Sequence, residues 1–160
     1  MYAFVRWLYL MSLIVWVGEV VFFSFVVAPV IFRTFPSAEA GRAVSAIFPA
    51  YYWIGYGCGV LLLGTTLILL ATAEVRTWLG VTALLAAGML AATVYAGTAI
   101  QPRAAALRPQ IHDPAAPPSV KDEFDRLHRL AVTLNVGVLL GGLLVSAVTA
   151  ATARWEHAPL

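Results

Sequence analysis

Four long stretches of the chain are almost free of charge, and the charged and turn-forming residues gather between them. Residues 43–73, 77–102 and 130–153 carry no charged residue, and the first stretch, 7–32, carries only one, Glu19. About 20 apolar residues in a helix cross a hydrocarbon layer of about 30 Å, so each stretch is long enough to span a bilayer. Backbone groups must pair internally in lipid, which favours helices. We expect spans near 7–32, 50–73, 77–100 and 128–152.

Composition agrees with this pattern. Of 160 residues, 61% are hydrophobic and 11% are charged, against about 45–50% and about 25% in soluble domains. The sequence therefore predicts an all-α fold, an integral membrane four-helix bundle that forms a single domain over residues 1–160. The lipid bilayer is its expected partner. A net charge of +2 is too small for a nucleic-acid-binding surface, so no nucleic acid is expected.

The basic residues predict an orientation. The first and third connections and their borders carry seven Lys or Arg residues, whereas the two termini and the second connection carry three, Arg6, Arg76 and Arg154. Positive residues favour the cytoplasm, so loops 33–49 and 101–127 should be cytoplasmic and both termini outside, in a bacterial inner membrane. The first span is longer than the apolar part of a signal peptide, so we expect it to be retained.

Both cytoplasmic loops carry local signals. Ser37 can cap a short interfacial helix that we expect to end at Pro49. The third loop is rich in proline and should be largely irregular until a capping-box-like pattern starts the last helix near Ser119. Pro29 removes a backbone donor from the first helix and should kink it.

Glu19 is the leading candidate for a functional residue, because a carboxylate in mid-bilayer costs at least about 2.5–3.5 kcal/mol on insertion scales. Two interpretations are open. Glu19 is a proton or cation site, or it is protonated and pins the first helix to the second by a hydrogen bond to Thr65 or Thr66.

A polar track towards Glu19 follows from heptad spacing on antiparallel helices. Matching residues by depth places Val26 near Asn135, Glu19 near Gly142, and Ser12 near Thr149. The candidate intramembrane polar site comprises Glu19, Arg33, Tyr51, Tyr52, His128 and Asn135. For His128 a simple role as an interfacial anchor is the alternative, and for Asn135 a hydrogen bond between helices.

The remaining signals are weaker. Cys58 is the only cysteine and is isolated in sequence from the methionines, so we predict no metal site and no cofactor. His112 and His157 are expected to be solvated. Small-xxx-small pairs at Gly55/Gly59 and Gly137/Gly141 permit close helix contact, either within the bundle or with a second copy or another membrane protein. No enzyme motif is present, so we expect no catalytic activity.

Several short motifs carry a family resemblance. They are Trp16-Val-Gly18 followed by Phe22-Phe23 and Ala28-Pro29, Phe48-Pro-Ala-Tyr-Tyr52, Ile100-Gln-Pro102, Arg108-Pro-Gln-Ile111, and Phe124-Asp-Arg-Leu-His128. Together they resemble the transmembrane-protein-205-like family, which implies a four-helix membrane domain without an established activity. A looser likeness connects the chain with small membrane proteins of copper resistance and haem handling. His128 alone lies near a span, which argues against ligation of haem by two histidines.

Three functions remain under consideration. The leading hypothesis is a small ion- or solute-handling transport protein that works through Glu19. The alternative is a non-catalytic accessory or scaffold subunit of a membrane complex, and haem or copper binding is the third.

Overall fold

Four long helical columns make up the protein in a computed structural model that describes residues 2–72, 77–112 and 116–152. The first column comprises α1 (Tyr2–Phe22), a π-helical turn η1 (Phe23–Val27) and α2 (Ala28–Thr34). The second is α3 (Ser37–Thr72). The third comprises α4 (Thr77–Tyr95), a second π-helical turn η2 (Ala96–Ile100) and α5 (Gln101–Leu107). A short 3₁₀ turn η3 (Gln110–His112) precedes the fourth, α6 (Pro118–Thr152).

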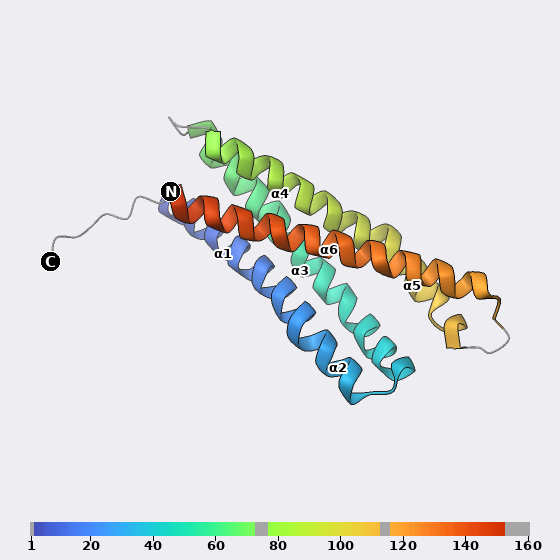
Figure 1. Ribbon diagram of the computed structural model, residues 1–160. Coiled ribbons are helices and arrows are strands. Elements are labelled where there is room, and N and C mark those ends of the chain that lie inside the picture. The colour runs from blue at the N-terminus through green and yellow to red at the C-terminus, as the bar shows by residue number, and fades with distance from the viewer. Residues whose placement is uncertain (1, 73–76, 113–115, 153–160) are drawn as a thin grey trace.

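The columns form an antiparallel bundle (Figure 1). α1 packs against α3, α3 against α4, α4 against α6, and α6 against α1. The start of α1 and the end of α6 lie at one end of the bundle, and the α2–α3 connection lies at the other (Figure 1). The predicted all-α four-helix membrane bundle is confirmed.

All four columns are long and apolar enough to cross a membrane, with 33, 36, 31 and 35 residues. At about 1.5 Å per residue each exceeds a hydrocarbon thickness of about 30 Å, so the ends extend into the interfacial regions. Large apolar side chains such as Phe25, Trp53 and Leu84 point outwards and are 67%, 73% and 76% exposed. A surface of this kind is stable when lipid covers it.

The predicted short interfacial helix is wrong, because Ser37 begins a continuous helix that passes through Pro49 into the second span. Proline removes one donor, but Ala40 and Val44 are buried and hold the preceding turns in the bundle. The prediction of an irregular third loop is also wrong for its described part, since α5 continues the third column to Leu107. The start of the last helix is confirmed, at Pro118 beside Ser119.

In two columns a π-helical turn directly precedes a proline near the start of the next helix. Pro29 is the second residue after η1, where the Ala28 N–H donates to the Phe23 carbonyl. Pro102 is the second residue after η2, where the Gln101 N–H donates to the Ala96 carbonyl. In both columns the helix therefore widens by one residue immediately before the proline. The sequence predicted a kink at Pro29, and the structure has the π-helical turn η1 there.

Trp16 fills the centre of the bundle and is 1% exposed. It packs where α3 lacks side chains: a Cβ atom at Gly59 would lie 2.9 Å from Trp16 Cη2, and one at Gly55 would lie 3.4 Å from its Nε1. Gly141 faces Met89 in the same way, with 2.9 Å from a Cβ to the Met89 Cγ. The sequence did not decide whether the glycine pairs contact helices of the same bundle or a partner. Gly55, Gly59 and Gly141 pack within the bundle.

Three residues used in the sequence predictions, Arg76, Arg154 and His157, lie outside the described residues.

Candidate functional site

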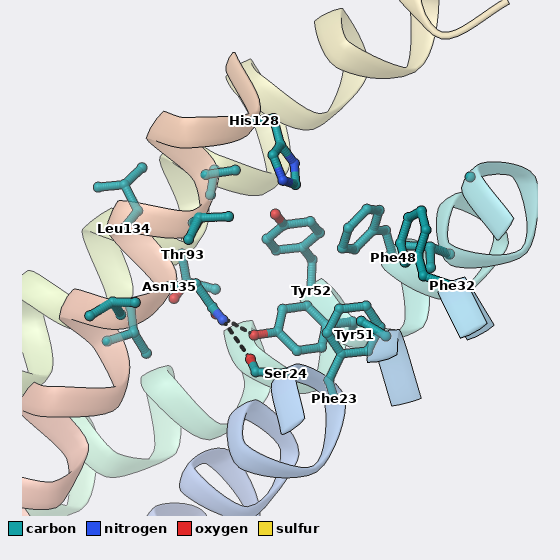
Figure 2. Close-up of a pocket in the computed structure, with 18 of the residues that line it drawn as sticks. Phe23, Ser24, Phe32, Phe48, Tyr51, Tyr52, Thr93, His128, Leu134 and Asn135 are labelled. Atoms are coloured by element: carbon teal, nitrogen blue, oxygen red, sulfur yellow. Dashed lines mark hydrogen bonds between the residues drawn. The ribbon is translucent and has the colours of Figure 1, made fainter. Parts of the chain in front are cut away.

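A pocket of about 550 Å³ opens between α2 and α6 in the half of the bundle that contains the α2–α3 connection. All four columns contribute residues to its wall, and most of these are apolar (Figure 2). Part of the wall is aromatic. Phe48 of α3 packs on Phe23 with ring centroids 5.6 Å apart, and on Tyr52 with centroids 5.8 Å apart. Pockets of about 300–1,000 Å³ are typical of small-molecule sites.

A hydrogen-bonded cluster forms the floor of this pocket. The Tyr51 hydroxyl donates to Asn135 Oδ1 over 2.6 Å, and Asn135 Nδ2 donates to Ser24 Oγ over 3.0 Å. These side chains come from α3, α6 and η1, so the cluster connects three columns (Figure 2). Polar side chains at membrane depth gain stability by satisfying one another. The cluster therefore fixes the rotation of α6 relative to η1 and α3.

Glu19 lies on α1, a little more than one turn before Ser24. Both of its carboxylate oxygens are enclosed and have no hydrogen-bond partner among the described residues. An enclosed acid without hydrogen-bond partners costs free energy.

The hydrogen bond from Glu19 to Thr65 or Thr66 is absent. Thr65 Oγ1 donates to the carbonyls of Leu61 and Leu62, and Thr66 Oγ1 donates to the carbonyl of Leu62. Threonine hydroxyls in helices commonly bond in this way to the preceding turn, and here this satisfies their donors. The alternative interpretation of Glu19 as a link to α3 is therefore wrong in that form.

Tyr52 and His128 lie at the outer side of the cluster. The His128 ring extends from α6 towards the Tyr52 hydroxyl (Figure 2). It stacks on Phe124, with ring centroids 6.3 Å apart and planes inclined by 4°. His128 is nevertheless exposed, so it is reachable from outside the bundle.

The six predicted residues are thus only partly brought together. Tyr51, Tyr52, His128 and Asn135 line one pocket. Glu19 on α1 and Arg33, which is exposed on α2, lie outside the lining. Arg33 lies near the end of α2, which diverges from α6 (Figure 1), so its side chain does not reach the floor of the pocket. Matching residues by depth takes no account of this divergence, and it therefore included Arg33 in the site.

The predicted depth matches between the first and fourth columns hold to within two or three residues. Asn135 contacts Ser24 where Val26 was expected, and Thr149 Oγ1 lies 2.6 Å from the Tyr9 hydroxyl where Ser12 was expected. A Cβ at Gly142 would lie 2.6 Å from Val17 Cγ2, where Glu19 was expected. The offset is consistent and arises because the columns start at different heights.

The pocket residues that the sequence analysis did not assign to the site include Ser24 and Arg108. Ser24 is one hydroxyl in an apolar run, and it stands five residues after Glu19, a spacing that does not put two side chains on one face of a helix. Arg108 follows the last residue of the third column and entered the sequence analysis only through its charge and the motif Arg108-Pro-Gln-Ile111. In the structure it reaches back to α3, where Nη1 donates to the Gly41 carbonyl.

The described residues contain no group of three or more His, Cys, Asp or Glu side chains that could hold a metal ion.

Comparison with known proteins places the chain among uncharacterised sequences. A family model described as "Domain of unknown function (DUF4149)" matches residues 11–113. An uncharacterized protein of Aquifex aeolicus (strain VF5) is 42% identical over 48 residues, which are 30% of this chain and 33% of that relative. The chain thus matches about a third of the length of this curated relative. No solved structure matches the chain.

Proposed function

The chain belongs to the DUF4149 family of domains of unknown function, and from that premise we propose that it is a small multi-pass membrane transport protein whose proton-binding group is Glu19. The observation that carries the proposal is the Glu19 carboxylate, enclosed and without a hydrogen-bond partner among the described residues. Glu19 stands five residues before Ser24, which lines the pocket.

The surrounding groups support a role in transport. Tyr51, Asn135 and Ser24 form a hydrogen-bonded cluster in the wall of the pocket, and a solute can displace these hydrogen bonds. Two π-helical turns adjoin this region, and such turns interrupt the regular hydrogen bonding of α-helices. Transport needs a path that a small conformational change can open. The hydrogen-bonded cluster and the two π-helical turns allow such a change at the pocket while the core around Trp16 stays packed.

The accessory-subunit alternative has less support. It relied on small size, on glycine faces and on the charged residues near 119–129. Of these glycines, Gly55, Gly59 and Gly141 pack within the bundle, whereas Gly137 is exposed and a Cβ there would have nothing within 4 Å. The likeness to the transmembrane-protein-205-like family fits either role. We propose further that the protein catalyses no bond-making chemistry.

Glu19→Gln is the test of the transport proposal. We expect proteoliposomes with the wild-type protein to carry a proton flux that a trapped pH dye reports, and Glu19→Gln to reduce this flux to that of empty vesicles. Glutamine preserves the size of the side chain but cannot bind and release a proton.

Glu39→Gln is the matched control, because Glu39 is an exposed acid at the start of α3. Its flux should equal that of the wild type. Equal flux in wild type and Glu19→Gln, with both proteins folded, would remove Glu19 from the mechanism.

We also propose a bacterial inner membrane as the location, with both termini outside. The prediction is that Arg6→Cys, introduced with Cys58→Ser, reacts with a membrane-impermeant maleimide added from the periplasmic side. Arg103→Cys in the same background should react only after the cytoplasmic side is exposed. The opposite pattern of labelling would reverse the orientation.

A further inference from the structure

Arg108 places a guanidinium group in the wall of the pocket. Its Cζ lies 5.7 Å from the centroid of the Phe124 ring, a cation–π arrangement that holds the group against α6. Nη1 donates to the Gly41 carbonyl on α3, while Nε is buried without a partner among the described residues. The guanidinium is thus held from two sides and keeps a donor available.

The charge of Arg108 is not balanced by the pocket. None of the described residues that line the pocket is acidic. Burial lowers the pKa of the Arg108 guanidinium below its ordinary value, because desolvation disfavours the charged form. An arginine remains charged nevertheless, and a planar guanidinium pairs well with a carboxylate or a phosphate. An anion bound at this position would provide the missing partner.

The rest of the pocket is suited to hydrocarbon. Phe25 and Phe32 on one side and Val132 and Val136 on the other all line it, and all four are also exposed, by 67%, 53%, 48% and 48%. Residues that both line a pocket and face outwards mark its opening. This opening faces sideways, towards the lipid that covers the exposed apolar helices, so a hydrocarbon chain can enter from the bilayer.

The length of the pocket fits one leaflet. Along α6 the lining extends from Phe124 to Val138, which is about 21 Å along the helix axis. Arg108 directly follows Leu107, the last residue of the third span, and therefore lies at the level of lipid headgroups. The charged end and the apolar length of the pocket thus follow the same order as an anionic lipid in a membrane.

We propose that this pocket binds an anionic single-chain amphipath drawn from the bilayer, with its carboxylate or phosphate at Arg108 and its hydrocarbon chain between α2 and α6. The inference deepens the proposed function, because it names the class of solute for the same pocket. It does not require that Glu19 bind protons.

The test is a titration of the purified protein in nonionic detergent with three probes, read by native mass spectrometry. The probes are palmitate, lysophosphatidylglycerol and zwitterionic lysophosphatidylcholine. We expect at least one of the two anions to bind more tightly than the zwitterion, and Arg108→Gln to weaken its binding about tenfold, since a charge-assisted hydrogen bond is lost. The tighter anion identifies the headgroup as a carboxylate or a phosphate.

Two further variants make the result specific. Arg103→Gln removes an exposed charge from α5, the helix that Arg108 directly follows, and should bind all probes as the wild type does. Val132→Trp fills the opening while keeping Arg108, and should weaken binding of all three probes. It serves as the independent test if Arg108→Gln does not fold.

Equal affinities of the wild type for all three probes would overturn the proposal, as would an equal loss in Arg103→Gln and Arg108→Gln, or unchanged binding in Val132→Trp. Glu19→Gln separates this inference from the transport proposal. It should bind the anionic probe normally even where its proton flux is lost.

Discussion

Trp16→Ala is expected to lower the free energy of unfolding by about 3 kcal/mol, as large-to-small changes in packed cores do. Trp16 is 1% exposed and fills the space beside Gly55 and Gly59. Lipid tails are as apolar as a protein core, so helix association in a bilayer depends on packing rather than on removal of apolar surface from water. Alanine leaves a cavity where α3 has no side chains to fill it.

Reversible unfolding in mixed micelles with increasing SDS measures this loss. The matched control is Trp53→Ala, because Trp53 lies on α3 and is 73% exposed. The control should remain close to the wild-type midpoint. Similar losses in both variants would mean that Trp16 is not the centre of the packing.

Gly59→Val is expected to be similarly damaging, for the opposite reason. A Cβ at this position would lie 2.7 Å from Leu90 Cδ1 and 2.9 Å from Trp16 Cη2. The new side chain meets neighbours from α1 and α4 at once, so neither can move aside without displacing the other. Overpacking of this kind costs about 1–3 kcal/mol and occasionally more.

Gly57→Val provides the comparison, since a Cβ at Gly57 has nothing within 4 Å. Both glycines lie in the middle of α3, so intrinsic helix propensity changes equally in the two variants. SDS unfolding should therefore separate them by the packing cost alone. A Gly59→Val protein as stable as Gly57→Val would show that the contact between α1, α3 and α4 is looser than these distances indicate.

Local patterns explain which parts of the fold were predictable. The spans follow from hydropathy, because a membrane leaves the backbone no alternative to a helix. The helix start near Ser119 follows from capping chemistry. Pro49 was misjudged because proline acts as a local signal, whereas the burial of Ala40 and Val44 that keeps the helix continuous is a long-range effect.

The candidate site shows the same division. Heptad spacing placed Asn135 near the right depth of the first column, two residues from its contact Ser24, because depth along a helix is proportional to residue number. Arg108 could not be assigned from spacing. Its contacts with Gly41 and Phe124 depend on how α3, α5 and α6 converge at one end of the bundle.

The sequence by itself determined that the chain forms four apolar helices, that a single acid, Glu19, lies within the first, and that polar residues occur at matching depths on its neighbours. These properties depend on composition and on the fixed rise of a helix. Only the tertiary structure decided the rotation of each helix and the angle between the columns. Rotation decided that Glu19 has no threonine partner and that the glycines at 55, 59 and 141 pack inside. The angle between α2 and α6 decided that a pocket opens there towards lipid, with Arg108 in its wall.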